Sequence, residues 1–555
     1  MRDANRLKEQ LRDAVAFGRL IEAEETLAAL REEYRANQTA FTPGFIKDIK
    51  QLGQQAGIKR TLKDVFGYDC FRPGQEEVIR AVLAGNDALA VMPTGSGKSL
   101  LYQLSAKILG GITLVISPLI SLQKDQVDAL NEGGLRATFL NSSLDYEARA
   151  QRIRGLYRGD FELVYAAPEG LEQSLGQLME NLDIRLIAVD EAHCISHWGH
   201  DFRPSYRNLA HLKDRFGSVP VLGLTATATP AVARDIAEQL GMISPFVYRG
   251  SFFRPNLRLY SIKKGGGGPN VRDAILSIVS ARKNQSGIIY CLSRKTVEAT
   301  AGFLKERGIR AAPYHAGMAP GDREATQEAF RRDDVDVVTA TIAFGMGIDK
   351  SNVRYVIHRD MPKSVEGYSQ EIGRAGRDGE MSDCVLFYSW ADVLALERFT
   401  DGLETSLAQT QQGQIRQMYS FADSASCRHQ ALARHFNEKI EPCKTSCDYC
   451  SGLDVMSEAP VKKARQTPPV KYTAPQASDA GQEDAEYAFG EIKKLRKQIA
   501  DQNKVPAYVV FSDATLRAMA QYRPQTEEQM LALSGVGLKK MEKYGQAFLQ
   551  ALRTM

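Results

Sequence analysis

The stretch Val91-Met-Pro-Thr-Gly-Ser-Gly-Lys-Ser-Leu100 follows the apolar run Ala88-Leu-Ala-Val-Met92 and leads into a segment compatible with a helix. A glycine-rich turn between a strand and a helix points successive backbone N–H groups at one anion, as in nucleoside triphosphate sites. Lys98 would hold the terminal phosphates and Ser99 a Mg²⁺ ion. The predicted ligand-binding residues are Thr94, Gly95, Ser96, Gly97, Lys98 and Ser99. A strict motif has glycine at position 92, so an ordinary Gly/Ser turn is the alternative.

Length, charge and hydropathy limit the classes of protein to be considered. The chain has 555 residues, more than one hydrophobic core accommodates, so three or four domains are expected. The net charge of +4 does not by itself indicate a nucleic-acid partner. The N-terminus is too charged for a secretory signal, and no apolar run approaches the roughly 18 residues of a membrane span. We therefore expect a cytoplasmic protein with reduced thiols.

Short apolar runs alternate with polar helical segments over two long parts of the chain, residues 61–247 and 248–398. Examples are Thr113-Leu-Val-Ile116 and Leu186-Ile-Ala-Val189 in the first part and Gly287-Ile-Ile-Tyr290 in the second. This alternation predicts an α/β fold with two lobes, each a doubly wound parallel sheet. We place the hinge between the lobes near residues 248–254.

The other parts of the chain have different compositions. They are a helical N-terminal extension (1–60), a cysteine-rich module (399–455), a flexible linker rich in Pro, Ala, Ser and Gln (456–483), and a small helical domain (484–555). In the last of these, Gly535-Val-Gly-Leu-Lys-Lys540 could bind phosphate, or could be a helical cap with a solvated lysine face.

The run Leu186–Val189 ends in two carboxylates, Asp190 and Glu191. At a strand end beside a phosphate loop, Asp190 would coordinate Mg²⁺ and Glu191 would activate the attacking water, although adjacent acids at a strand end are also common surface features. Phosphoryl transfer further requires positive charge on the transition state. The second lobe offers Arg374 and Arg377 on a glycine-rich turn.

Four cysteines lie close together in sequence: Cys427, Cys443, Cys447 and Cys450. In a reducing compartment, four thiolates closed around one ion form a structural tetrahedral Zn²⁺ site. Four unrelated free thiols are the alternative. His429 and His435 are nearby but are not needed to complete the shell.

Several motifs, in order and spacing, resemble those of the RecQ family of superfamily 2 helicases over about residues 62–450. They are Leu62-Lys-Asp-Val-Phe-Gly-Tyr-Asp-Cys-Phe-Arg-Pro-Gly-Gln75, Met92-Pro-Thr-Gly-Ser-Gly-Lys-Ser99, Asp190-Glu-Ala-His193, Thr225-Ala-Thr-Ala-Thr229 and Gln370-Glu-Ile-Gly-Arg-Ala-Gly-Arg377. The resemblance implies two RecA-like lobes and an ATP-dependent 3′–5′ DNA helicase that uses Mg²⁺ and Zn²⁺. Met92 is usual in that family. Tyr68 and Arg72 would sandwich the adenine of ATP, and Gln75 would bond its edge.

The segment after the acidic pair carries aromatic residues and a cation on a loop, which suits stacking of single-stranded bases. It resembles the aromatic-rich loop by which the family couples DNA binding to ATP hydrolysis. The predicted coupling residues are His193, His197, Trp198, Phe202 and Arg203. The family usually has glutamine where this chain has His197. Trp198 and Phe202 could instead be core residues.

The C-terminal part of the chain departs from the usual family pattern at two points. The spacing of Cys443 and Cys447 is one residue longer than usual, and no room exists for the winged-helix domain that commonly follows the zinc module. The last domain resembles an HRDC domain. The resemblance implies single-stranded and forked DNA as partners, a single-strand-binding protein as a further candidate, a role in recombination and repair, and a bacterial cytosol or nucleoid location. The oligomeric state stays open, with a monomer favoured. A DNA-stimulated translocase with weak unwinding and a non-catalytic scaffold are the alternatives.

Overall fold

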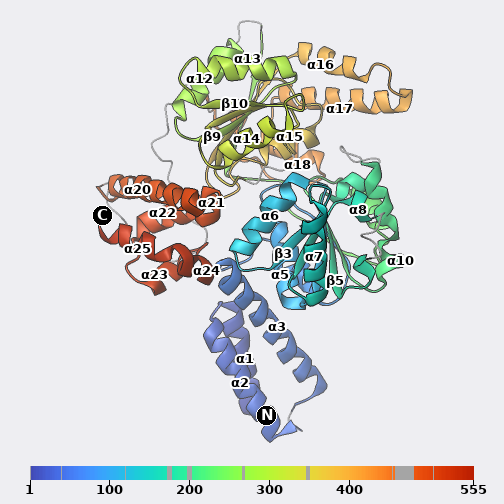
Figure 1. The fold of residues 1–555 in the computed structure, drawn as a ribbon, viewed down its shortest axis with the longest axis vertical. Helices are drawn as coiled ribbons and strands as arrows, with labels where there is room; N and C mark the ends of the chain where they lie inside the picture. The colour runs from blue at the N-terminus through green and yellow to red at the C-terminus, as the bar shows by residue number, and fades with distance from the viewer. Residues whose placement is uncertain are drawn as a thin grey trace.

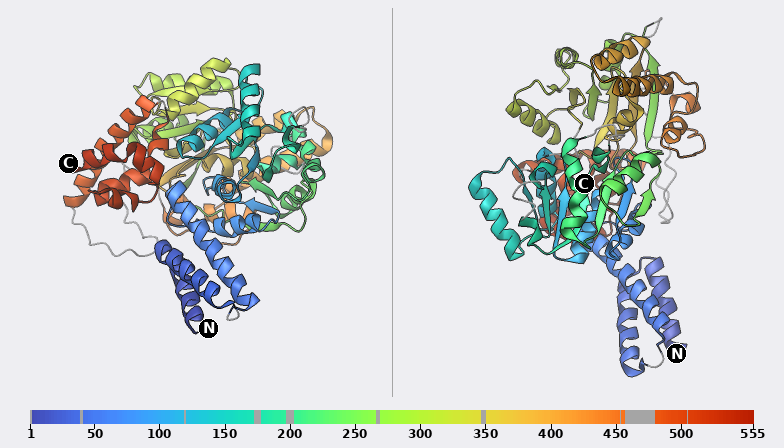
Figure 2. Two further views of the ribbon diagram at one scale, coloured as in Figure 1. Left: turned by 60° about the horizontal axis from the view of Figure 1, so that its bottom comes forward. Right: turned by 90° about the vertical axis from the view of Figure 1, so that its right-hand side faces the viewer.

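The structure is a computed structural model that describes residues 2–38, 41–118, 120–171, 178–196, 203–265, 269–345, 350–452, 454–456, 480–503 and 505–555. Two α/β lobes lie one above the other, an N-terminal helical unit projects from the first, and a C-terminal helical domain lies beside both (Figures 1 and 2). None of the described helices is both long and apolar enough to cross a membrane.

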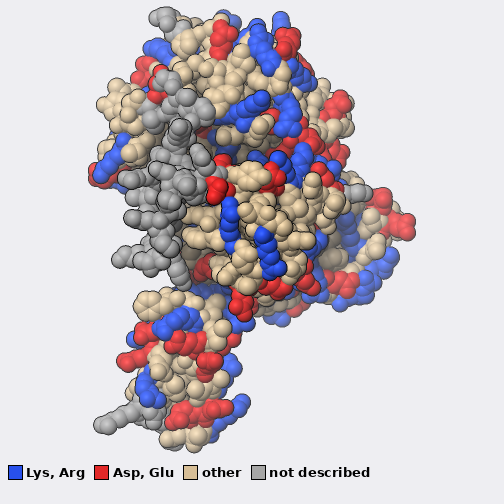
Figure 3. All heavy atoms as spheres, turned by 90° about the vertical axis from the view of Figure 1, so that its left-hand side faces the viewer, with Lys and Arg blue, Asp and Glu red and all other residues tan. Residues whose placement is uncertain are grey.

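The N-terminal unit consists of α1 (Arg2–Ala16), α2 (Leu20–Ala36) and α3 (Pro43–Phe66). Its small core includes Leu11 and Leu30, and its surface intersperses both signs of charge (Figure 3). The predicted boundary after residue 60 falls within α3, which continues without a break to Phe66 and is capped by Gly67 with a φ of 72°.

The first lobe is built on a seven-stranded parallel sheet of order β3-β4-β2-β5-β6-β1-β7. The strands are β1 (Ala88–Val91), β2 (Ile112–Ile116), β3 (Ala137–Leu140), β4 (Leu163–Ala166), β5 (Ile184–Val189), β6 (Val221–Thr225) and β7 (Phe246–Arg249). The main helices are α4 (Gln75–Leu83), α5 (Ser99–Leu109), α6 (Ile120–Glu132), α7 (Tyr146–Arg158) and α11 (Pro230–Gln239). The order places the carboxyl ends of β5, β6 and β1 side by side, where ligands bind in such sheets.

The second lobe is built on a six-stranded parallel sheet of order β10-β11-β9-β12-β13-β8. The strands are β8 (Leu257–Lys263), β9 (Ser286–Tyr290), β10 (Ala311–Tyr314), β11 (Val337–Ala340), β12 (Val353–His358) and β13 (Ser382–Tyr388). The helices are α12 (Val271–Ala281), α13 (Arg294–Lys305), α14 (Pro320–Arg331), α15 (Val365–Ile372) and α16 (Trp390–Glu397). Tyr248 and Arg249, which the prediction assigns to the second lobe, pair with β1 of the first lobe.

The cysteine-rich module consists of α17 (Thr405–Asp423), α18 (Arg428–His435) and α19 (Asp448–Ser451). It packs against the first strand of the second lobe: the Leu259 amide donates to the Ser446 carbonyl at 3.1 Å, and the Ser261 amide donates to Asp448 at 2.8 Å. The chain that enters the second lobe is therefore held by this module.

The C-terminal domain has its own core and consists of α20 (Ala480–Asn503), α21 (Ala507–Val510), α22 (Asp513–Tyr522), α23 (Glu527–Leu531), α24 (Leu538–Lys540) and α25 (Gln546–Arg553). Helix α20 begins at Ala480, within the last residues of the predicted linker, and residues 457–479 lie outside the described part of the chain.

This domain contacts both lobes, which the sequence did not predict. Towards the first lobe, the Gly535 amide donates to the Gly67 carbonyl at 2.8 Å, and the Lys539 side chain lies against Gly134, just after α6. Towards the second lobe, Lys497 pairs with Asp334 at 2.8 Å. The stretch 535–540, predicted as a phosphate site or a solvated cap, thus lies at a domain contact.

Candidate nucleotide-binding site and metal centre

The phosphate loop joins β1 to α5 and has the shape of an anion cradle. Gly95 and Gly97 have φ angles of 83° and 82°, which L side chains rarely adopt. A Cβ atom at Gly97 would lie 2.7 Å from the Gln75 amide nitrogen. The buried Ser96 hydroxyl makes no hydrogen bond to any group of the described chain. A loop with such spare donors fits the phosphates of ATP.

Lys98 faces the acidic pair across this loop. Its ammonium donates to the Met92 carbonyl at 3.0 Å. Burial lowers the pKa of Lys98, while the charges of Glu191 and Asp190 act in the opposite direction. A lysine held in this way by weak backbone acceptors is able to turn to a phosphate, which is a much stronger acceptor.

The acidic pair leaves β5 in an uncommon backbone conformation. Glu191 has a φ of 48°, a left-handed value that costs about 1–3 kcal/mol in a residue with a side chain. Its buried Oε2 lies 3.4 Å from His193 Nδ1, and the same nitrogen lies 3.0 Å from the Thr225 hydroxyl. His193 therefore joins the acidic pair to the end of β6. The sequence gives no signal for the strained backbone of Glu191.

The two predicted arginines of the second lobe lie in different surroundings. A Cβ atom at Gly95 would lie 3.2 Å from Arg377 Cγ, so Arg377 faces the phosphate loop. Arg374 is 5% exposed and lies against Tyr290 and Gly345 inside the second lobe. The structure therefore brings Arg377, and not Arg374, to the loop.

The three residues predicted for the adenine pocket lie beside the loop. Gln75 donates to the carbonyls of Ser96 and Gly97, both at 3.1 Å, and accepts from the Arg72 amide at 2.9 Å. The Arg72 guanidinium donates to the Gly95 carbonyl. Tyr68 is 46% exposed. In this conformation, the polar groups of Arg72 and Gln75 are bonded to the phosphate loop.

The predicted DNA-coupling segment is described only in part. His197, Trp198 and Phe202 lie outside the described residues. The Arg203 amide donates to the Cys194 carbonyl at 2.9 Å. The nearby Tyr206 is fully buried and donates to the Asp190 carbonyl at 2.9 Å, so it is a core residue.

The four cysteines meet at one point. Their sulfur atoms all lie within 4.8 Å of one another, as a tetrahedral Zn²⁺ site requires. The extra residue between Cys443 and Cys447 is accommodated by Lys444, whose φ of 64° tightens the turn. His429 donates instead to the carbonyls of Leu257 and Ser446, at 3.0 and 3.1 Å. The donor set therefore fits Zn²⁺ with cysteine ligands alone.

Four protein families match consecutive parts of the chain. They are "DEAD/DEAH box helicase" at residues 72–236, "Helicase conserved C-terminal domain" at 270–379, "RecQ zinc-binding" at 390–451 and "HRDC domain" at 486–552. The first two matches cover the lobes that carry the acidic pair and the arginine turn. They imply ATP and Mg²⁺ as cofactors, and the third, with the cysteine cluster, implies Zn²⁺.

Full-length relatives match most of the chain. An "ATP-dependent DNA helicase RecQ" of Pasteurella multocida is 39% identical, with 89% of this chain and 94% of the relative covered. The protein of the same name from Haemophilus influenzae is also 39% identical, with 89% and 95% covered. That of Bacillus subtilis is 34% identical, with 89% and 98% covered. The chain belongs to the RecQ family of ATP-dependent DNA helicases.

Proposed function

We propose that this protein couples Mg-ATP hydrolysis to 3′–5′ movement along single-stranded DNA and to unwinding of forked duplexes. The observation that carries the proposal is that the phosphate loop of the first lobe faces Arg377 of the second lobe. A nucleotide held at such a boundary makes its hydrolysis sensitive to the relative position of the lobes. The 3′–5′ polarity rests on the family resemblance alone.

Each side chain of the nucleotide site has a separate proposed role in ATP hydrolysis. When bound, Mg-ATP supplies the γ-phosphoryl group that water attacks. Lys98 holds the terminal phosphates, Ser99 and Asp190 hold the magnesium ion, and Glu191 orients the water and accepts its proton. Arg377 stabilises the charge that develops on the transferred group.

In this proposal, Arg374 does not contact the phosphates and instead supports the turn that carries Arg377. Its burial between Tyr290 and Gly345 fixes the turn that carries Arg377. Tyr68, Arg72 and Gln75 bind the adenine after the loop contacts of Arg72 and Gln75 rearrange.

A strand-separation assay tests the proposal. A forked duplex with a 3′ single-stranded tail should be unwound in the presence of ATP and Mg²⁺, and one with only a 5′ tail should not. ATP hydrolysis, measured in parallel, should rise on addition of single-stranded DNA. Brisk hydrolysis without strand separation would favour the translocase, and absence of hydrolysis would favour the scaffold.

Trp198→Ala should lower DNA-stimulated ATP hydrolysis while basal hydrolysis persists. One base stacked on an aromatic ring contributes about 1–3 kcal/mol, so the DNA concentration for half-maximal stimulation should rise about tenfold. The matched control is Trp390→Ala, because Trp390 is the other of the two tryptophans and is 51% exposed on α16. Equal loss of basal and stimulated rates would contradict a coupling role.

The proposed function also includes the DNA substrates, the partner protein, the oligomeric state, the location and the biological role. We propose single-stranded and forked DNA as substrates, a single-strand-binding protein as partner, a monomeric state, a cytoplasmic and nucleoid location, and a role in recombination and repair. We also propose that the strands separate without a winged-helix domain. Among the described residues, helix α20 of the C-terminal domain is the first element after the cysteine-rich module.

A further inference from the structure

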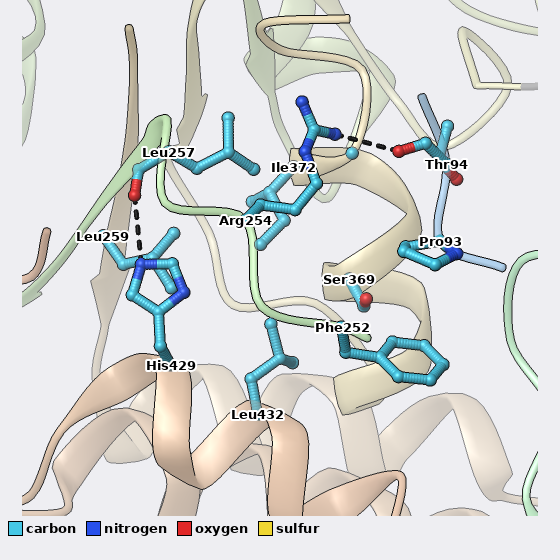
Figure 4. A pocket seen from close by; sticks show the side chains of 11 residues that line it. Pro93, Thr94, Phe252, Arg254, Leu257, Leu259, Ser369, Ile372, His429 and Leu432 are labelled. Atoms are coloured by element: carbon cyan, nitrogen blue, oxygen red, sulfur yellow. Dashed lines mark hydrogen bonds between the residues drawn. The ribbon is translucent and has the colours of Figure 1, made fainter. Parts of the chain in front are cut away.

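Arg254 lies where the chain crosses from the first lobe to the second, between β7 and β8, and its guanidinium bonds to both lobes. Nη1 donates to the Thr94 carbonyl of the phosphate loop at 2.9 Å (Figure 4). Nη2 donates to the carbonyls of Gly376 at 2.6 Å and Ala375 at 3.2 Å, in the turn that carries Arg374 and Arg377. One side chain thus joins the two halves of the nucleotide site.

The Arg254 guanidinium lies beside the phosphate loop, where the phosphates of ATP are proposed to bind. A Cβ atom at Gly95 would lie 2.9 Å from Arg254 Nη1. Burial lowers the pKa of Arg254 to about 10, and the nearby Arg377 acts in the same direction. Arg254 remains a cation at neutral pH, so it adds positive charge next to the loop.

The cysteine-rich module holds the backbone on both sides of Arg254. On one side, the Phe252 ring stacks on Phe436 with centroids 3.9 Å apart and planes 7° apart, and the Phe252 amide donates to Glu438 at 2.7 Å. On the other side, His429 donates to the Leu257 carbonyl at 3.0 Å (Figure 4). These contacts fix the segment 252–257 at both ends.

We propose that Arg254 is a positioning residue that aligns Arg377 with the phosphate loop, and that the cysteine-rich module acts on ATP hydrolysis by holding Arg254 in place. A planar guanidinium is suited to this task, because its fork reaches two lobes at fixed angles. An ammonium group presents its three donors from a single nitrogen atom and lacks this fixed fork. The inference rests on the proposed ATP-driven function, since it assigns a role within that site.

Arg254→Gln and Arg254→Lys test the first half of the proposal. A catalytic group displaced by about 1 Å can cost about 100-fold in rate, so kcat for DNA-stimulated hydrolysis should fall by about that factor in both variants. The affinity for a fluorescent non-hydrolysable ATP analogue should stay close to wild type in Arg254→Lys, because this variant keeps a positive charge beside the phosphate loop. A loss of affinity equal to the loss of kcat would make Arg254 a ligand-binding residue, and an unchanged kcat would remove its role.

A matched variant controls for loss of stability. Arg258 lies four residues further along, in β8, and pairs with Asp383 at 2.6 Å within the second lobe. Arg258→Gln should lower thermal stability and leave kcat largely unchanged. Small-angle scattering supplies a readout that does not need turnover: the analogue should compact the wild-type protein and Arg258→Gln, but not Arg254→Gln. If the wild type binds the analogue and compacts but hydrolyses no ATP, the proposed function fails while this result still decides on Arg254.

Phe436→Leu tests the second half. The substitution removes the ring stacked on Phe252 and leaves every cysteine ligand in place. It should lower kcat with zinc content unchanged, and its effect should not add to that of Arg254→Gln, because both act through one contact chain. Full additivity of the two effects on kcat would overturn the link between the module and Arg254.

Discussion

Lys98→Ala should abolish ATP hydrolysis and, with it, DNA unwinding. Removing one preorganised donor from a transition-state site typically costs about 10²–10³-fold in kcat. Lys98 belongs to the loop and interacts with both Glu191 and Asp190, so we expect a loss at the upper end of that range. Steady-state hydrolysis with saturating single-stranded DNA measures it.

Lys107→Ala is the matched control for this prediction. Lys107 lies at the other end of the same helix, α5, and pairs with Glu162 at 2.8 Å. Its loss should leave kcat near the wild-type value. If Lys98→Ala retained more than about a tenth of wild-type activity, the phosphate loop would not hold the nucleotide in the assigned way.

Cys447→Ser should unfold the cysteine-rich module. Cys447 is fully buried, and its sulfur belongs to the four-atom cluster. Structural Zn²⁺ contributes about 10–16 kcal/mol in small zinc-binding peptides, so loss of a ligand is expected to release the ion and the helices around it. Because β8 bonds to this module, the second lobe should also lose thermal stability. Zinc content of the purified protein and its melting temperature measure both effects.

Cys70→Ser is the control, because Cys70 is exposed and lies outside the cluster. It should retain one zinc ion per chain. Chelation of the wild-type protein should reproduce the Cys447→Ser melting temperature. Full zinc content in Cys447→Ser would reject the four-cysteine assignment.

The sequence predicted the interior strands better than the edge strands. β2, β5 and β9 are buried at every position except Arg185 of β5, so each contains an apolar run that is visible without a structure. The edge strands β7 and β10 are short and partly exposed. Each has only four residues, and Pro313 lies within Ala-Ala-Pro-Tyr of β10, which argues against a strand when read from the sequence alone.

In the nucleotide site, residues within short sequence motifs could be predicted, whereas residues placed by contacts between distant parts of the chain could not. Lys98 and Asp190 belong to short motifs whose chemistry follows from neighbouring residues. The hydrogen bonds of Arg254 join it to residues 121 to 160 positions away, so no spacing rule identifies it. The left-handed φ of Glu191 accompanies the contact of His193 with Thr225 at the end of β6, which likewise depends on the folded sheet.

The contacts of the C-terminal domain with the two lobes differ in stiffness. Its Gly535 amide meets the Gly67 carbonyl directly, backbone to backbone, and no side chain can rotate to take up movement there. The contact between Lys497 and Asp334 is an ion pair between partly exposed side chains, and such pairs contribute about 0–1 kcal/mol and weaken as salt screens them. Further ion pairs lie on both sides, Lys543 with Glu132 on the first lobe and Arg517 with Glu380 on the second. Raising the ionic strength should weaken the ion pairs on both sides and leave the backbone contact at Gly67 in place.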